Sequence, residues 1–227
     1  MAGGSVSNIE VCNLSYSGNL QQLRSLILSN PRLINQPDQD QRSALHWACS
    51  AGHDDVVEFL LDSGAEVDLQ DDARWTPLHI AASAGREEIV RRLIAKRAQL
   101  NSVNQNGCTP LHYAASKDRY EIAQILLENG ADPNATDKLE STPLHRASAK
   151  GNHRLIQLLL NQSASTNIQD SEGNTPLHLA CDEERVEAAK LLVEHGASIY
   201  IGNKEEKTPL QIAKGGLASL LRRIVEG

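Results

Sequence analysis

Thr109-Pro110-Leu111-His112-Tyr113-Ala114-Ala115 decides the fold, because near-copies of its first four residues recur along the chain at a fixed interval. The other copies begin at residues 43, 76, 142, 175 and 208, so the period is 33 residues at every step. Aligned copies without an insertion indicate a repeat array, in which each unit contacts only its neighbours. The 227 residues are therefore expected to form a stack of similar units rather than a globule around one central core.

Each copy has the features of a helix start. Thr can cap a helix through its hydroxyl, and Pro at the next position lacks only an N–H group that would have no partner there. Ahead of the copies, stretches such as Asp170-Ser171-Glu172-Gly173 have the composition of a type I turn. Behind them, Val56, Val57, Leu60 and Leu61 show the spacing of an amphipathic second helix. Each unit is thus predicted to be a projecting turn followed by two helices.

The period and the T-P-L-H core together resemble the ankyrin repeat. The resemblance implies an all-α solenoid of seven helix-turn-helix repeats with projecting hairpin tips and a concave binding face. We expect a single domain over residues 1–227. Its parts are a degenerate capping repeat at 5–38, full repeats at 39–71, 72–104, 105–137, 138–170 and 171–203, and a closing cap at 204–227.

Glycine is replaced at several positions where a left-handed backbone is expected. Arg97 and Ser163 follow second helices at the place where other repeats have Gly, at a cost of roughly 1–2 kcal/mol each if the backbone conformation is kept. The fourth turn position also lacks Gly in four units, which have Gln41, Arg74, Glu140 and Glu206. Binding at these tips and drift at a tolerant surface explain the replacements equally well.

Composition and charge restrict the class of partner. The formal net charge is -7 and no run of Lys or Arg occurs, which argues against nucleic acid as a partner and favours a partner with basic patches. Met1 to Ser5 have neither the charge nor the apolar run of a secretory signal, and no stretch is long enough to span a membrane. The four cysteines form no C-x-x-C pair, so a reduced intracellular compartment is expected.

Catalytic and metal sites are not expected, nor is any cofactor. Five of the eight histidines are the last residues of successive signatures: His46, His79, His112, His145 and His178. Packed helices lie roughly 8–10 Å apart, so these side chains cannot share one ion and are predicted to be structural hydrogen-bonding groups. No phosphate-binding loop and no nucleophile-histidine pairing is indicated. The chain is therefore predicted not to be an enzyme.

One short motif remains open. Leu179, Cys181 and Glu183 form an L-x-C-x-E pattern, which resembles the ligand of retinoblastoma-family pockets. The repeat register, however, places this segment inside a first helix with Cys181 packed between helices. Such pockets take the peptide in an extended form, so binding would require the repeat to open.

Longer stretches resemble a particular ankyrin-repeat family. Residues 44–53, 103–108 and 174–185 are similar to the assembly chaperones that are non-ATPase subunits of the proteasome regulatory particle, and the resemblance covers essentially the whole chain. It implies a monomeric scaffold of the cytoplasm and nucleus that binds the C-terminal domain of an AAA ATPase subunit. Links to a cyclin-dependent kinase, the retinoblastoma protein and a ubiquitin ligase are also implied. The alternative functions are ankyrin-type inhibition of a cyclin-dependent kinase or of a transcription factor.

The binding surface is predicted to be one concave strip formed by the turn tips and the exposed sides of the first helices. The tip residues are Asp40, Arg42, Asp72, Arg74 and Trp75, and the first-helix residues are Trp47, Ile80, Tyr113, Lys117, Lys150, Asp182 and Glu183. Two exposed tryptophans are expected as anchors. The resemblance implies that Arg42 and Lys117 bind acidic side chains of the ATPase domain. Basic side chains of that domain are then expected at Asp40, Asp72, Asp182 and Glu183.

Overall fold

The computed structural model describes residues 5–227, and the prediction about a secretory signal at Met1 to Ser5 falls almost entirely outside this range. Within it the chain forms fourteen α-helices and no β-strand, so the predicted all-α repeat fold is confirmed. None of these helices is both long and apolar enough to cross a lipid bilayer. The contacts divide the chain into two compact units, residues 1–105 and 106–227. The single domain over residues 1–227 stays a prediction.

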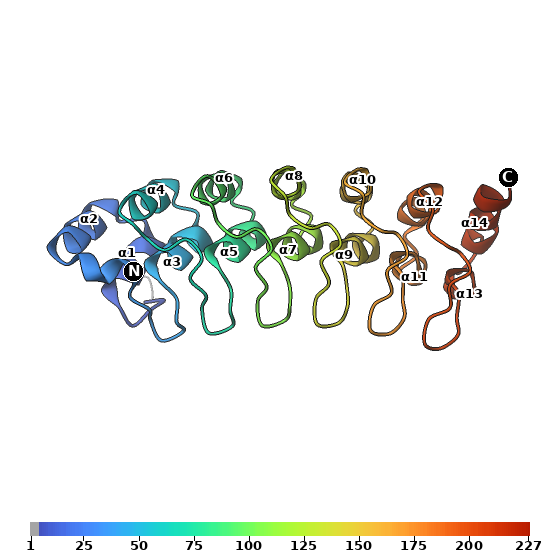
Figure 1. Cartoon of the computed structure of the whole chain (residues 1–227), viewed down its shortest axis with the longest axis horizontal. Coiled ribbons are helices and arrows are strands. Elements are labelled where there is room, and N and C mark those ends of the chain that lie inside the picture. The colour runs from blue at the N-terminus through green and yellow to red at the C-terminus, as the bar shows by residue number, and fades with distance from the viewer. Residues whose placement is uncertain (1–4) are drawn as a thin grey trace. The chain divides into compact units, whose positions relative to one another are not determined.

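Unit 1 contains three helix pairs, with hairpin tips that project on the side away from the second helices (Figure 1). The pairs are α1 (Glu10–Ser17) with α2 (Leu20–Ser29), α3 (Ala44–Ala51) with α4 (Asp54–Asp62), and α5 (Pro77–Ala84) with α6 (Glu87–Ala95). A short 3-10 helix, η1 (Pro31–Asn35), follows α2.

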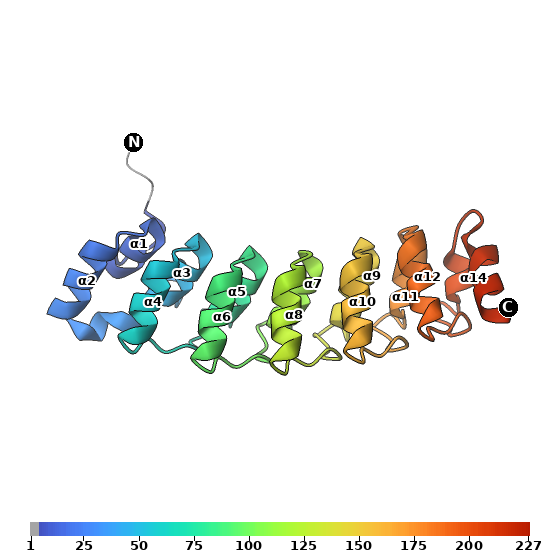
Figure 2. The same ribbon diagram turned by 90° about the horizontal axis from the view of Figure 1, so that it is seen from above.

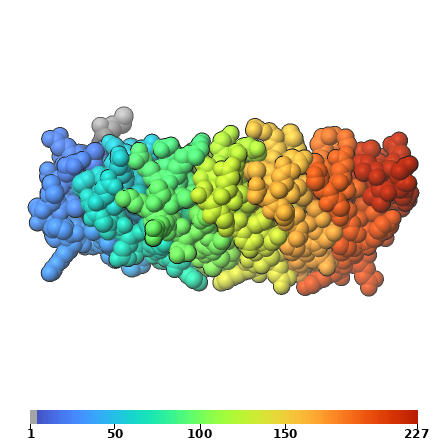
Figure 3. Space-filling model, turned by 45° about the horizontal axis from the view of Figure 1, so that its top comes forward, coloured from blue at the N-terminus to red at the C-terminus, as the bar shows by residue number. Residues whose placement is uncertain are grey.

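Unit 2 contains four further pairs with the same arrangement. They are α7 (Pro110–Ser116) with α8 (Tyr120–Glu128), α9 (Pro143–Lys150) with α10 (His153–Asn161), α11 (Pro176–Asp182) with α12 (Val186–Glu194), and α13 (Pro209–Ile212) with α14 (Leu217–Glu226). Seen from the second-helix side, α8, α10 and α12 lie beside one another in chain order (Figure 2). In the space-filling view of this unit, consecutive repeats form adjoining bands of colour (Figure 3), as expected of a stack in which each repeat packs against its sequence neighbours.

The signature starts the first helices from α3 onwards in the predicted way. In α9, the Thr142 hydroxyl accepts a hydrogen bond from the backbone N–H of His145 at 3.3 Å, while Thr142 N–H donates to His145 Nδ1 at 3.1 Å. Pro143 follows Thr142 at the first helical position. Two N-terminal donors are thus satisfied by one reciprocal pair, which is a capping box with His in place of the usual acid.

The signature histidines also join neighbouring repeats. In unit 1, His46 Nε2 lies 2.9 Å from the Trp75 carbonyl oxygen. In unit 2, the Nε2 atoms of His112, His145 and His178 lie 2.8–2.9 Å from carbonyl oxygens 29 residues further on. Because Nδ1 accepts from the backbone, the proton is on Nε2 and donates to the next repeat. Burial lowers the pKa of these four histidines, which favours the neutral form that this bonding requires.

Hairpin tips are joined by backbone hydrogen bonds within each unit. Asp72 N–H donates to the Asp40 carbonyl at 3.0 Å in unit 1. In unit 2, Lys138, Ser171 and Lys204 donate in the same way to the preceding tip at 2.8–3.0 Å. This ladder uses main-chain groups only, so tip side chains are free to differ from one repeat to the next.

The left-handed backbone is kept where glycine is replaced. Gln41, Arg74, Glu140 and Glu206 have φ between 58° and 64°, and Arg97 and Ser163 have φ of 63° and 64°. The left-handed conformation of the glycine cap is therefore kept at Arg97 and Ser163, and the strain is carried by non-glycine residues.

The C-terminal ends of several first helices are capped by the following repeat. Arg86 Nη2 donates to the Ser50 carbonyl at 2.9 Å, and Arg185 Nε donates to the Ala149 carbonyl at 3.2 Å. A Cβ atom on Gly52 would lie 2.7 Å from Arg86 Cζ, and one on Gly151 would lie 2.8 Å from Arg185 Cδ. The positive φ favours glycine at the end of these first helices, and the missing side chain leaves room for the arginine packed over it.

Candidate functional site

Three tips begin with a buried acid that organises the turn, namely Asp38, Asp71 and Asp137. Asp137 Oδ1 accepts hydrogen bonds from the backbone N–H groups of Leu139 and Ser141 at 2.9 and 3.0 Å, and Asp38 holds its own turn in the same way. Burial by itself would raise the pKa of Asp137, but the hydrogen bonds from Arg146 and from these N–H groups lower it below its ordinary value. The acid is therefore ionised, and its second oxygen is available to a cation.

In unit 1 that cation is Arg42. Its Nε donates to Asp71 Oδ2 at 3.1 Å, and the two side chains are 29% and 2% exposed. The guanidinium also stacks on Trp47, with Cζ 4.9 Å from the ring centre. Arg42 lies on the predicted surface, but its Nε–H group is already bonded to Asp71 within the protein. The sequence alone did not indicate this bond.

The expectation of two exposed tryptophans was wrong. Trp47 is half-buried, its Nε1 donates to Asp38 Oδ2 at 2.7 Å, and Tyr16 packs edge-on against it at 5.7 Å. Trp75 is also half-buried, and Ile80 is only 7% exposed. These side chains lie mostly beneath the surface and pack against other residues of the chain, so they are not exposed apolar anchors.

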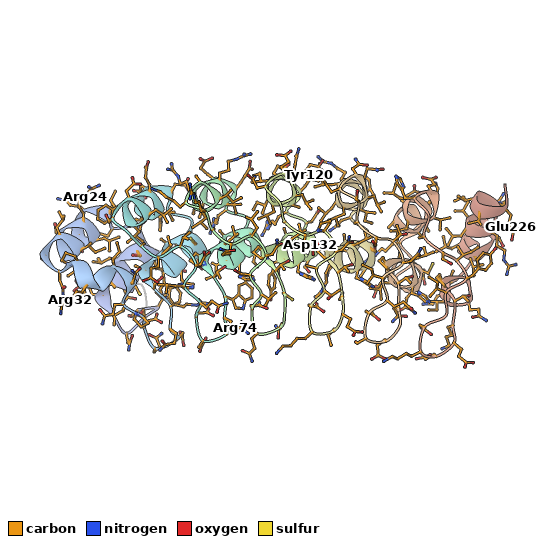
Figure 4. The ribbon with its side chains drawn as sticks, viewed as in Figure 1. Arg24, Arg32, Arg74, Tyr120, Asp132 and Glu226 are labelled. Carbon is orange, nitrogen blue, oxygen red and sulfur yellow. The ribbon has the colours of Figure 1, made fainter. Side chains whose placement is uncertain are left out.

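The charged tip residues of unit 1 are the more accessible ones. Asp72 and Arg74 are exposed, and Asp40 is half-exposed. Figure 4 shows Arg74 at the end of its hairpin. These side chains are thus within reach of a partner on the tip side of unit 1.

The first helices of unit 2 present an ordered array of side chains. Residues four apart lie on the same side of a helix, which gives the pairs Tyr113 with Lys117 on α7, Arg146 with Lys150 on α9, and Leu179 with Glu183 on α11. Lys117, Lys150, Asp182 and Glu183 are exposed. The array is therefore basic on α7 and α9 and acidic on α11.

Two residues of this surface were missed by sequence reasoning. Arg146 is held by the buried Asp137, and Leu139 is 63% exposed at a tip. Arg146 follows a signature histidine, in register with Trp47, Ile80 and Tyr113, so the repeat pattern itself could have identified it.

The L-x-C-x-E segment is largely helical. α11 ends at Asp182, and of the three motif residues Cys181 is fully buried, Leu179 is half-buried and Glu183 is exposed. Burial raises the pKa of the Cys181 thiol to about 12. The expected packing of Cys181 between helices is confirmed.

The second helices of unit 2 carry one notable hollow. It has a volume of about 480 Å³ and lies between α10 and α12, beside Tyr120 of α8, whose ring is 4.4 Å from Arg154 Cζ. Figure 4 shows Tyr120 on this side. Across residues 5–227, no group of three or more His, Cys, Asp or Glu side chains is arranged to hold a metal ion.

Comparisons with known proteins agree with this geometry. Residues 63–137 and 131–203 match the family model for ankyrin repeats in three copies, and residues 40–72 match the single ankyrin repeat. The 26S proteasome non-ATPase regulatory subunit 10 of Homo sapiens is 67% identical over 72 residues, which are 32% of this chain and 32% of that protein. Its Mus musculus counterpart is 65% identical over 72 residues, 32% of this chain and 31% of that protein.

These relatives are gankyrins, so the resemblance indicated by the sequence is confirmed over the matched segment. The match spans about a third of the length of these curated relatives. Among solved structures, the ankyrin repeat domain of Bcl-3, described as a unique member of the IkappaB protein family, has a TM-score of 0.84 and 28% identity over 97% of this chain and 99% of that chain. The repeat register, the helix pairs and the family match lead to one conclusion: the chain belongs to the ankyrin-repeat family.

Proposed function

We propose that this chain is a protein-interaction scaffold of the proteasome, an assembly chaperone that binds the C-terminal domain of an AAA ATPase subunit of the regulatory-particle base. The 67% identity to the human proteasome subunit over 72 residues carries this proposal. Ankyrin repeats present a preformed surface and supply no catalytic groups of their own. The proposed role is therefore non-enzymatic. We also propose that the protein acts as a monomer in the cytoplasm and nucleus.

The proposal assigns binding residues to each unit separately, on the tip side of unit 1 and on the first-helix face of unit 2. Exposed Lys117 and Lys150 on the latter face acidic groups of the partner, while Asp182 and Glu183 face basic ones. In unit 1 the corresponding tip charges are Asp40, Asp72 and Arg74, with Arg42 partly engaged by Asp71. Mixed signs fix the docking register because like-charge mismatches are penalised.

A second candidate function is supported by a separate observation. The similarity to the Bcl-3 ankyrin domain extends over 97% of the chain, which favours inhibition of a transcription factor as the alternative. Affinity capture from cell lysate separates the two: recovery of proteasome ATPase subunits supports the scaffold, and recovery of transcription factors without them supports the alternative. Cyclin-dependent kinase, retinoblastoma protein and ubiquitin ligase remain further proposed partners.

Titration against the isolated ATPase domain tests the surface. The double variant Lys117→Glu with Lys150→Glu reverses two exposed charges that have no ion pair among the described residues. We expect binding to weaken by roughly 2 kcal/mol or more. Reversal of Arg42 is unsuitable, because a glutamate there would face the buried Asp71.

The matched control is Arg154→Glu with Lys190→Glu on the second helices of the same unit. It makes the same change in net charge on the opposite side, beside the hollow lined by both residues. This control should leave binding nearly unchanged. Equal losses from both double variants, with folding intact, would remove the first-helix face as the site.

A further inference from the structure

Arg146 has a local arrangement that no other residue of the first-helix face in unit 2 shares. Its side chain is 36% exposed, while the Asp137 carboxylate that it contacts is 2% exposed. Nη2 donates to Asp137 Oδ2 and lies 3.9 Å from Cys108 Sγ. One edge of the guanidinium is therefore fixed to the base of a hairpin tip, which is itself held by two backbone hydrogen bonds to Asp137.

The remaining donors of Arg146 are unequal. Nε is buried and has no hydrogen-bond partner. Nη1 also has no hydrogen bond to any described residue, but it is not buried. Nη1 is thus the part of the side chain that reaches solvent. A guanidinium that is already oriented loses less conformational entropy when it binds a carboxylate.

The surroundings of Arg146 determine the charge of its ligand. Lys150 lies one turn further along α9, and Lys117 occupies the equivalent position on the adjacent α7, so three cations share this part of the face. The acids of the neighbouring elements are Asp118, which lines a hollow with Tyr120 and His153 at the start of the second helices, Glu140, which is exposed at the tip, and Asp182 and Glu183 at the end of the adjacent α11, where Glu183 holds the register position of Lys150. Both oxygens of Asp137 already accept hydrogen bonds within the chain. Positive charge is therefore in excess on the α7 and α9 part of the face, which fits a carboxylate ligand.

We propose that Arg146 is a partner-binding residue of unit 2, held in place by Asp137, and that it binds an acidic side chain of the protein partner between Lys117 and Lys150. The inference rests on the proposed function for the choice of partner, but its chemistry requires only an exposed Asp or Glu on that partner. Arg42 in unit 1 also contacts a buried aspartate, but it reaches from one tip to the next, whereas Arg146 reaches from its first helix to the tip of its own repeat.

Two substitutions of Arg146 separate orientation from charge. Arg146→Gln removes the cation and ends at the position of Nε, short of the Nη2 atom that contacts Asp137, whereas Arg146→Lys keeps a cation beside Asp137 without the second terminal nitrogen. In titrations of the full chain with the ATPase C-terminal domain, both variants should bind about tenfold more weakly. Arg154→Gln on the second helices should bind within about twofold of the unmodified chain. Unchanged binding by Arg146→Lys and Arg146→Gln would overturn the inference.

A second arm uses hexaglutamate as the ligand and amide NMR shifts of the full chain as the readout. We expect shifts around Lys117, Arg146 and Lys150 that Arg146→Gln abolishes, and hexalysine should instead perturb α11. If the ATPase domain does not bind but these hexaglutamate shifts occur, the proposed function fails and the inference stands. If neither ligand depends on Arg146, the inference fails. Thermal unfolding of each variant shows whether it is folded, and Arg146→Lys keeps the test valid should Arg146→Gln unfold.

Discussion

At the scale of single residues, one buried hydroxyl lowers the stability of its repeat. Ser148 lies in α9 at the position where other first helices have Ala82, Ala115, Cys49 or Cys181. It is fully buried, and its hydroxyl has no hydrogen-bond partner. A buried hydroxyl without a partner lowers stability because its hydration is lost and not replaced.

Ser148→Ala should therefore raise the free energy of unfolding, by about 1 kcal/mol. Urea denaturation followed by circular dichroism measures the change. Ser15→Ala is the matched control, since Ser15 is equally buried but its hydroxyl donates to the Val11 carbonyl at 2.8 Å. A gain of the same size from the control would show that the missing bond is not the cause.

At the scale of elements, the histidine links tie stability to pH. The pKa values of His46, His112, His145 and His178 are lowered below 6.5 by burial, and only the neutral ring can accept at Nδ1. Below the unfolded pKa the unfolded chain binds more protons than the folded chain, so stability falls as pH falls. Above about pH 6.5 the contribution is complete.

We expect each of these histidines to contribute a slope of up to about 1.4 kcal/mol per pH unit below pH 6.5, until its folded pKa is reached. Thermal melts between pH 7.5 and 5 measure the sum. His145→Gln should flatten the dependence, because Gln211 already performs the capping role in the last repeat, where it accepts from Thr208 N–H at 2.8 Å. An unchanged slope in this variant would contradict the assignment.

Whether the L-x-C-x-E segment can bind a retinoblastoma pocket also depends on its helix. Cys181 is buried within α11, which has neighbouring first helices on both sides, so an extended peptide can form only if the repeat opens, at a cost of several kcal/mol. Isothermal titration of the folded chain against an isolated retinoblastoma pocket domain should show weak binding or none. Tight binding that Glu183→Gln abolishes would contradict this.

The elements also show how far the sequence could predict the structure. The 33-residue period, the Thr-Pro helix starts and the positive φ at Arg97 and Ser163 followed from local chemistry, because each depends on residues close in sequence. The pairing of Arg42 with Asp71 did not, since the two are 29 residues apart and belong to different tips. The contacts of Arg146 with Asp137 and of Trp47 with Asp38 lie within one repeat, and they were missed because they join a first helix to its own tip, which helix periodicity does not describe. Contacts between repeats, and between the elements of one repeat, decide which side chains of the surface remain accessible.

At the scale of the whole molecule, charge controls how partners approach. The net charge is -7 over 227 residues, and the exposed charges of the proposed surface have both signs. Association with a basic partner should therefore be accelerated by electrostatic steering, and salt should reduce the effect.

We expect the association rate with the ATPase domain to fall by about tenfold between about 50 and 500 mM NaCl, with a smaller change in the dissociation rate. Stopped-flow fluorescence of the half-buried tryptophans measures both rates. Lys117→Glu with Lys150→Glu should alter this salt dependence, while Arg154→Glu with Lys190→Glu gives the effect of net charge alone. An association rate independent of salt would show that steering is absent.

The arginines that cap the preceding repeat also limit how repeats can be exchanged. Gly52 and Gly151 leave room for Arg86 and Arg185 of the next repeat. Asp118 occupies the same register position as these glycines and also has positive φ. The residue of the next repeat that corresponds there to Arg86 and Arg185 is the shorter Asn152. An Arg at the start of a second helix is therefore accommodated by a Gly at the end of the first helix of the preceding repeat. The repeats are consequently not interchangeable modules: a shuffled or consensus array built from this chain has to transfer these two positions together, although they belong to different repeats.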